Sequence, residues 1–292
     1  MIGVGSDGSV ALLEREAEGP QRAGLPFGIG LLNWALDRHP ELLDTALAAS
    51  PGLVSVSFGD GWAWGGRVHA VGVVTATQIA SVDEAREAED AGIQVLVARG
   101  SEGGGHGDPK VGTLPLLEAV LDAVSVPVLA AGGISSPRGL AAVLAAGASG
   151  AWMGTAFSAC PESLASDSTR DALVKAKETE TVTTTVFDAA LGYRWPPRFP
   201  ERVLRNPFSE LWSGREQELV LDPEARASLV DGITAGDLRT AHVDAGQGVG
   251  SLTEVRSVED VMERLCVGAM ELLGAWAPKG ESHPCGHDGC PT

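Results

Sequence analysis

The sequence predicts an α/β fold, and within that class a TIM-type (β/α)8 barrel. Short apolar runs alternate with amphipathic stretches along the first 160 residues, which is typical of parallel strands joined by helices. Two successive apolar runs end in glycine, in the segments AAGGIS (130–135) and WMGTAF (152–157). Glycines after the last two strands of a barrel typically build a phosphate site, so this pair favours a barrel over an open doubly wound sheet.

The individual elements follow from periodicity, caps and turn residues. Apolar runs typical of buried strands occur at residues 2–5, 27–32, 53–58, 68–74, 94–98, 127–131 and 150–153. Stretches that match helices occur after Ser81 and at residues 10–17, 40–49, 113–124 and 137–146. Ser81 and Glu84 have the spacing of a capping box, and Pro137 suits the first turn of a helix.

The order of these strands leaves the expected barrel incomplete. If residues 127–131 and 150–153 are strands 7 and 8, then residues 2–5 are strand 2, and strand 1 with its helix is missing. An open barrel of seven strands has two exposed edges, which a later segment or a second subunit, as in a homodimer, would have to cover. Residues 1–160 are therefore expected to hold barrel strands 2–8 and the binding site.

The regular alternation stops after residue 160. Helices are expected at 168–180, 206–214, 224–238 and 258–273, a β-rich stretch at 181–187, and an irregular arm rich in proline and arginine at 194–205. Residues 161–276 would form a helical and irregular extension packed on the barrel, and residues 277–292 a disordered tail. The spacing of His283, Cys285, His287 and Cys290 in that tail matches no standard zinc site, so we expect no metal there.

Composition excludes several classes of partner. A net charge of −18 argues against binding to a nucleic-acid backbone or an anionic membrane. No apolar run reaches the ~18 residues that a membrane span needs, and the first residues lack the basic and apolar regions of a signal peptide. Four scattered cysteines do not suggest a disulfide framework. We therefore expect a cytoplasmic protein that acts on a small molecule.

The segment 99–108, RGSEGGGHGD, has the features of an active-site loop. It follows an apolar strand, and its glycines allow backbone N–H groups to approach a ligand closely. His106 places a side chain that titrates near neutral pH at the same end of the strand. We therefore take His106 as the candidate catalytic residue.

The segments ARGSEGGGHGD (98–108) and PVLAAGGISSPRGLAAVLAAGASGAWMGTAF (127–157) resemble the nitronate monooxygenase family, formerly called 2-nitropropane dioxygenases. The resemblance extends over roughly residues 2–208. It implies an FMN-dependent barrel that oxidises alkyl nitronates, with O2 giving a carbonyl compound and nitrite. His106 would then abstract the α-proton of a neutral nitroalkane or help to bind the anionic nitronate.

The resemblance also implies a set of FMN contacts. Backbone groups of Gly132, Gly133, Trp152 and Met153 would surround the phosphate together with Gly154 and Thr155. Gly104 would pack close to the flavin. Gln78 would touch the flavin, and Arg99 would either stabilise the reduced, anionic flavin or form an ion pair with Glu102.

Two alternatives stay open at this point. An NAD(P)H-dependent reductase of quinones or enoyl thioesters would use a related flavin-binding barrel. A truncated barrel without strand 1 would be non-catalytic and would serve as a partner subunit, because relatives carry a Pro-Met pair beside the flavin on that strand. Many relatives also have glutamine at the position of Arg99, whose guanidinium is always charged.

Overall fold

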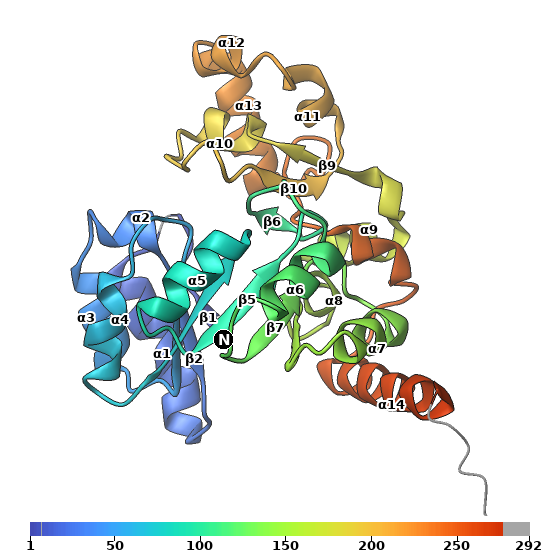
Figure 1. Cartoon of the computed structure of the whole chain (residues 1–292). Coiled ribbons are helices and arrows are strands. Elements are labelled where there is room, and N and C mark those ends of the chain that lie inside the picture. Colours follow the sequence, from blue (N-terminus) through green and yellow to red (C-terminus); the bar gives the residue numbers. More distant parts are fainter. Residues whose placement is uncertain (7, 277–292) are drawn as a thin grey trace, which may run out of the picture.

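The computed structural model describes residues 1–6 and 8–276 and contains a curled parallel sheet of seven strands (Figure 1). Each strand pairs in parallel with the next one along the sheet. In sheet order the strands are β1 (Ile2–Gly3), β2 (Gly28–Leu32), β3 (Leu53–Ser57), β4 (Val74–Ile79), β5 (Val95–Arg99), β7 (Val128–Ala131) and β8 (Gly150–Trp152). The expected α/β class and a parallel sheet of seven strands are confirmed, and six of the strands lie where they were expected; β1 and β8 are not paired, so the sheet is open between them.

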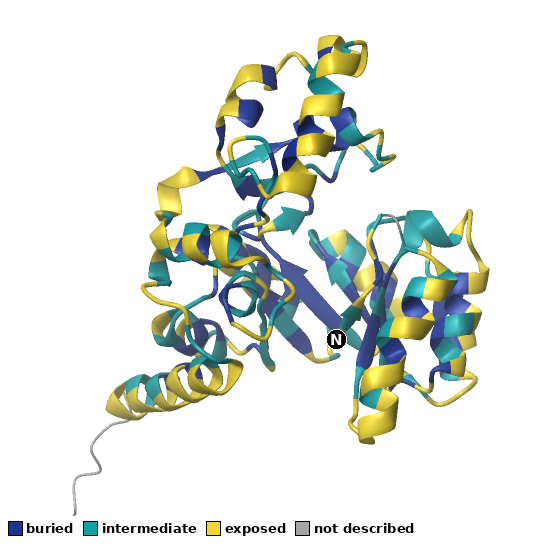
Figure 2. Ribbon diagram, turned by 180° about the vertical axis from the view of Figure 1, so that it is seen from behind, coloured by how far each residue is buried: buried dark blue, intermediate teal, exposed yellow. Residues whose placement is uncertain are grey.

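Helices alternate with these strands and cover the sheet. Figure 2 shows the strands buried inside and the helices exposing their outer faces. The main hydrophobic core lies between the two and joins residues from Val4 to Ala269. The helices of this part are α1 (Val10–Ala23), α2 (Asn33–Leu36), α3 (Glu41–Ala48), α4 (Ala63–His69), α5 (Val82–Asp90), α6 (Thr113–Leu121), α7 (Pro137–Ala145) and α8 (Thr155–Ser158).

The register of the sheet brings three strand ends to one edge. Arg99 of β5 lies opposite Ala131 of β7, and Ala131 lies opposite Trp152 of β8. Parallel strands run in the same direction, so the residues that follow these three positions leave the sheet together. The glycine loop after β5 and the glycines after β7 therefore meet the end of β8.

The strand expected at residues 68–74 is wrong. The first part of that run ends helix α4, Gly72 has φ +74 in the following turn, and the strand is β4, Val74–Ile79. Strand β4 contains polar residues and therefore lacks the apolar run by which a buried strand is predicted. Thr77 can be buried in it because its hydroxyl donates a 2.7 Å hydrogen bond to the carbonyl of Val56. Gln78 belongs to the same strand.

The part of the chain after residue 160 contains both helices and an antiparallel sheet. Its helices are α9 (Asp167–Lys175), η1 (Glu178–Glu180), α10 (Val186–Leu191), α11 (Pro207–Trp212), α12 (Glu216–Val220), α13 (Pro223–Ala235), η2 (Gln247–Ser251) and α14 (Val258–Trp276). The expected irregular arm at 194–205 is wrong in its second half, which forms strand β10 (Glu201–Leu204). Strand β10 lies between β6 (Gly105–His106) and β9 (Thr181–Thr184), so its backbone groups are paired on both sides.

Two further observations bear on the expectations. In the described part of the chain, no helix is both long and apolar enough to cross a membrane. The tail at residues 277–292, with His283, Cys285, His287 and Cys290, lies outside the described residues.

Candidate active site

A cavity of ≈ 310 Å³ lies at the carboxyl ends of the central strands of the parallel sheet. All of the residues predicted for the site line this one cavity, while their roles in binding and catalysis stay predictions. They are Gln78, Arg99, Gly104, His106, Gly132, Gly133, Trp152, Met153, Gly154 and Thr155. The end of a parallel sheet is the usual place for a ligand in such folds.

The glycines after β7 are required by close packing as well as by conformation. Gly132 and Gly133 have φ values of +108 and +68, which side chains with a β-carbon rarely adopt. A β-carbon on Gly132 would lie 2.8 Å from the hydroxyl oxygen of Thr113. Thr113 is held there by Glu102, whose carboxylate accepts hydrogen bonds of 2.7 Å from both its N–H and its hydroxyl. The turn therefore leaves no room for a side chain at Gly132, and both glycines line the cavity.

A segment from the C-terminal part completes this side of the cavity. The N–H of Gly246 donates a 3.0 Å hydrogen bond to the hydroxyl of Thr155. A β-carbon on Gly248 would lie 2.6 Å from the carbonyl oxygen of Gly133, so the two backbones touch. Sequence reasoning missed this segment, although the alternating glycines at 246, 248 and 250 were a visible signal of close backbone approach.

Gly104 also makes a close approach to the same segment. A β-carbon there would lie 2.6 Å from the backbone nitrogen of Gly246. The next residue, Gln247, donates a 2.9 Å hydrogen bond from its N–H to the carbonyl oxygen of Glu102. The glycine loop is thus joined to residues 246–248 by backbone contact, and Gly104 serves that contact while it lines the cavity.

Arg99 is buried under the glycine loop and does not pair with Glu102. Its guanidinium donates hydrogen bonds of 2.8 and 2.9 Å to the carbonyl oxygens of Gly103 and Gly105. Burial, assisted by the nearby Arg202, lowers the pKa of Arg99 to about 10, which leaves it cationic at neutral pH. The ion pair considered for Arg99 is therefore wrong, because Glu102 is already bound to Thr113; a flavin contact stays a prediction.

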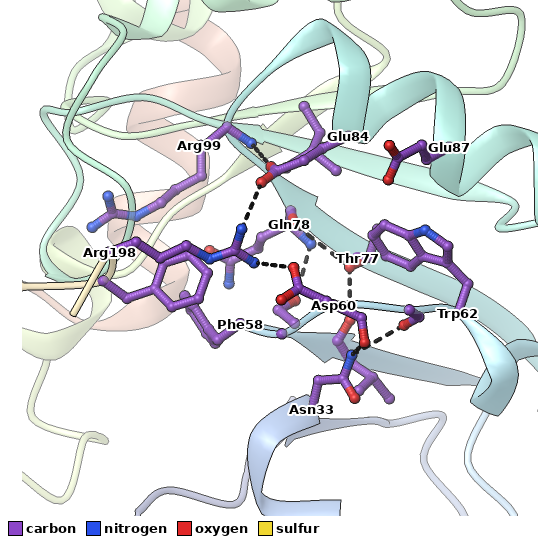
Figure 3. Close-up of a pocket in the computed structure, with 17 residues that line it drawn as sticks. Asn33, Phe58, Asp60, Trp62, Thr77, Gln78, Glu84, Glu87, Arg99 and Arg198 are labelled. Carbon is purple, nitrogen blue, oxygen red and sulfur yellow. Dashed lines mark hydrogen bonds and ion pairs between the residues drawn. The ribbon is translucent and has the colours of Figure 1, made fainter. Parts of the chain in front are cut away.

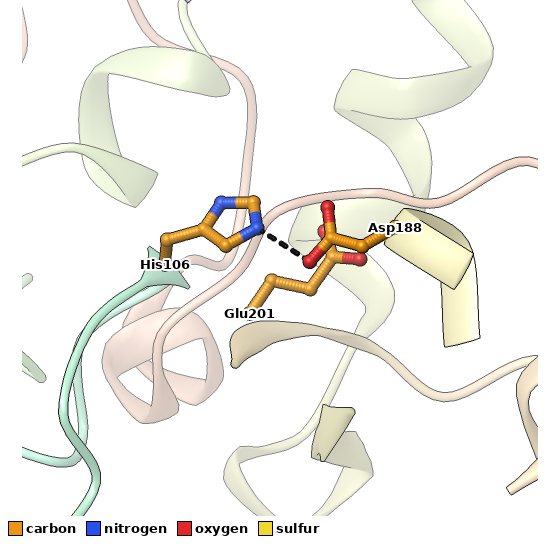
Figure 4. Close-up of side chains that lie close together, drawn as sticks. All are labelled: His106, Asp188 and Glu201. Atoms are coloured by element: carbon orange, nitrogen blue, oxygen red, sulfur yellow. Dashed lines mark hydrogen bonds and ion pairs between the residues drawn. The ribbon is translucent and has the colours of Figure 1, made fainter. Parts of the chain in front are cut away.

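His106 is held by the C-terminal part of the chain. Its strand, β6, pairs with β10, where His106 lies opposite Glu201. Its Nε2 lies 2.9 Å from Oδ2 of Asp188, a residue of α10, and both side chains are largely buried (Figure 4). The indole of Trp195 stacks on the imidazole with ring centroids 3.6 Å apart and planes within 5°.

Two further carboxyl groups lie near this histidine. Glu201 is 3% exposed and its Oε1 has no hydrogen-bond partner, so burial first, then Asp244 and Asp188, raise its pKa to about 9. One ring nitrogen of His106 and one carboxyl oxygen each from Asp188 and Glu201 all lie within 4.8 Å of one another. Asp244 lines the cavity and is exposed to it, and desolvation at the cavity wall raises its pKa. Sequence reasoning missed all three acids.

A second cavity of ≈ 70 Å³ adjoins the first (Figure 3). Arg198, on the segment before β10, lies at this cavity. It donates a 2.9 Å hydrogen bond to Asp60 and lies 3.6 Å from the carboxylate of Glu84. The two cavities share Phe58, Gln78 and Arg99. These contacts join the segment before β10 to the residues after β3 and to helix α5.

Comparison with known proteins gives a consistent result. A model of the nitronate monooxygenase family matches residues 38–268. A probable nitronate monooxygenase of Staphylococcus aureus strain Newman is 42% identical over 146 residues, which cover 47% of this chain and 41% of that protein. The corresponding protein of strain JH9 is 45% identical over 132 residues, covering 42% and 37%. The chain thus spans about two fifths of the length of these curated relatives.

Solved structures share the fold over nearly the whole chain. FabK from Thermotoga maritima superposes with a TM-score of 0.80 at 30% identity, covering 94% of this chain and 86% of that one. A nitroalkane oxidase from Streptomyces ansochromogenes gives 0.77 at 26% identity, covering 94% and 88%. The enoyl reductase domain of MlnA from Bacillus amyloliquefaciens gives 0.62 at 13% identity, covering 91% and 86%, which shows a shared fold alone. Because the family model covers most of the sequence, including the glycine loop and both strand ends, the chain belongs to the nitronate monooxygenase family.

Proposed function

We propose that this protein is an FMN-dependent oxidoreductase that oxidises alkyl nitronates with O2 to a carbonyl compound and nitrite. The observation that carries the proposal is one cavity lined both by the glycine turns after β7 and β8 and by His106. The glycine turns would bind the phosphate of a cofactor, and His106 would act on a substrate. Membership of the family and the likeness to a nitroalkane oxidase support the same reaction.

The residues at the cavity fit FMN. The turn at Gly132 and Gly133 leaves no room for side chains and lines the cavity, so its backbone N–H groups would be the donors to a dianionic phosphate. The segment at Gly246 and Gly248 and the hydroxyl of Thr155 close the same side. A space of ≈ 310 Å³ lies in the range of cofactor sites. When bound, FMN would supply the redox chemistry of the reaction.

The chain itself would supply binding and proton transfer. His106 lines the cavity and carries an imidazole, the side chain best suited to accept or donate a proton near neutral pH. With a neutral nitroalkane it would accept the α-proton; with a preformed nitronate it would hold the anionic nitro group. Its contacts with Trp195 and Asp188 limit rotation of the ring and so hold the ring nitrogens in fixed positions.

The first test is the visible absorption spectrum of the purified protein, followed by an assay of nitrite release. Flavin bands near about 370 and 450 nm that survive desalting would support the FMN site. Release of nitrite from propyl-2-nitronate would support the reaction. Failure to retain FMN even after reconstitution would favour the alternative of a non-catalytic protein.

Replacing His106 tests its role. We expect His106→Asn to keep FMN bound but to reduce turnover of a neutral nitroalkane by about 100-fold or more, since asparagine cannot take the α-proton. Turnover of the nitronate should fall less, because that substrate has already lost the proton. Unchanged turnover of the neutral substrate would contradict the assignment.

The second candidate is an NAD(P)H-dependent reductase of quinones or enoyl thioesters. Such an enzyme would use a related flavin-binding barrel, so the fold alone does not decide between the two reactions. Rapid bleaching of the bound flavin by NAD(P)H in the absence of a nitronate would favour it. Slow or absent bleaching, together with nitrite release, would favour nitronate oxidation.

A further inference from the structure

Two contacts hold the ring of His106: a hydrogen bond at one ring nitrogen and an aromatic ring stacked on its face. Nε2 lies 2.9 Å from Oδ2 of Asp188, and the side chains of the pair are only 14% and 10% exposed. With so little water present, a broken hydrogen bond here would not be replaced by one to solvent. Figure 4 shows the second ring nitrogen, Nδ1, on the side of the ring away from Asp188.

The face of the ring is held by Trp195, which is itself anchored. The indole stacks on the imidazole at 3.6 Å and donates a 2.8 Å hydrogen bond from Nε1 to the hydroxyl of Ser6. It also makes edge-on contacts with Trp34 and Phe58 at 5.4 and 5.1 Å between centroids. A stacked indole with this many contacts leaves the imidazole no easy route to rotate.

We propose that Asp188 is a positioning residue that holds His106 as the Nε2–H tautomer and leaves Nδ1 as the nitrogen that takes the substrate proton. This inference rests on the proposed function. A carboxylate accepts hydrogen bonds and has none to donate, so the proton between the two side chains belongs to Nε2. The lone pair is then on Nδ1, and His106 is part of the cavity wall.

The proton transfer balances without another reactant. The Cα–H bond of a neutral nitroalkane breaks, its electron pair stays on the substrate as the nitronate, and the proton forms a bond with Nδ1. The ring becomes an imidazolium with a proton on each nitrogen. The carboxylate of Asp188 and the face of Trp195 both stabilise that cation.

The tautomer can be measured directly, without substrate. In the FMN-loaded protein labelled with [15N]histidine, long-range 1H–15N correlation spectra at mildly alkaline pH report which ring nitrogen carries the proton. The signals of His106 are those absent from the His106→Asn variant. We expect the proton on Nε2. A proton on Nδ1, or an even mixture of tautomers, would overturn the proposal.

Kinetics of Asp188→Asn provide a second readout. The amide keeps the shape of the side chain but cannot stabilise the imidazolium, so turnover of the neutral nitroalkane should fall by about 100-fold or more. Turnover of preformed propyl-2-nitronate should fall by less than about tenfold, since no α-proton is removed. FMN content should stay at the wild-type level. The matched control is Asp231→Asn, an exposed aspartate on α13, which should change neither rate.

The outcomes separate this inference from the proposed function. If the wild-type protein releases no nitrite, the proposed function fails, while the spectra still decide the tautomer. If the wild-type protein is active and Asp188→Asn loses both substrates equally, or neither, the positioning role of Asp188 is overturned.

Discussion

Glu201 shows at the scale of one residue how the C-terminal part shapes the site. Its carboxyl group is buried beside Asp188 and Asp244, and one of its oxygens has no hydrogen-bond partner. Such a group stays protonated, because ionisation would place an uncompensated charge in a poorly hydrated site that already holds two other acids. Glu201 therefore keeps the number of negative charges around His106 low.

This protonation predicts a particular dependence of stability on pH. The carboxyl group ionises near its ordinary pKa of 4.5 in the unfolded chain but at about 9 in the folded one. Between these values the folded state binds one proton more, so this group lowers the free energy of unfolding progressively as the pH rises. Glu201→Gln removes the ionisation. We expect its melting temperature, relative to the wild type, to increase between about pH 5 and pH 9.

Thermal unfolding of both proteins at matched FMN content checks this expectation. Glu210→Gln is the control, because Glu210 is exposed on α11 and should show no such trend. If the difference in melting temperature between the wild type and Glu201→Gln stayed constant across this pH range, Glu201 would be ionised in the folded protein.

At the residue scale, the sequence predicted the placement of those site residues that lie in contiguous motifs. The glycines and His106 sit in short contiguous motifs, so their meeting at one strand edge followed from the order of strands alone. Asp188 is 82 positions from His106, and nothing in its own neighbourhood marks it as a partner. Arg99 illustrates another limit, because its charge suggested a carboxylate whereas it binds backbone carbonyl oxygens.

At the scale of elements, prediction failed where polar residues lie inside a strand. The threonines of β4 are buried because neighbouring strands and side chains satisfy their hydroxyl groups, which no local pattern announces. Strand β10 was missed for a related reason. It gains its partners from β6 and β9, which come from distant parts of the sequence. Helices with clear caps, such as α5 after Ser81 and α7 after Ser136, were found.

Helix α14 offers a matched test of how this element packs. Gly268 faces α7, where an added β-carbon would lie 2.7 Å from the ring of Pro137, whereas at Gly274 nothing lies within 4 Å. Alanine normally stabilises a helix relative to glycine by up to about 1 kcal/mol. We therefore expect Gly274→Ala to raise the free energy of unfolding and Gly268→Ala to lower it, because the rigid ring cannot move aside.

Denaturant titration of the two variants measures both effects on one helix. The two glycines share a helix and a substitution, so the difference between the variants isolates the contact with α7. Equal stabilisation by both would mean that α14 does not pack against Pro137 in solution.

At the scale of the whole molecule, we propose that residues 1–160 and 161–276 form one functional unit. The first part supplies the parallel sheet, the glycine turns and His106. The second part supplies Asp188, Trp195 and Glu201 around His106, and Gly246 and Gly248 against the glycine turns. An extension that only covered the sheet would neither contact His106 nor line the cavity, as Asp244 and Gly248 do.

If the two parts share the FMN site, a small change at their junction should weaken FMN binding. A β-carbon at Gly248 would lie 2.6 Å from the carbonyl oxygen of Gly133 and from the hydroxyl of Ser135, so Gly248→Ala must push the two segments apart. A ligand at 100 times its Kd stabilises the folded state by about 2.7 kcal/mol. At an FMN concentration that gives the wild type this stabilisation, we expect a clearly smaller increase in melting temperature for Gly248→Ala. Gly19→Ala on α1, where nothing lies within 4 Å, should keep the full increase. An undiminished increase for Gly248→Ala would mean that FMN is bound by the first 160 residues alone, since only then would the spacing of the two parts leave its affinity unchanged.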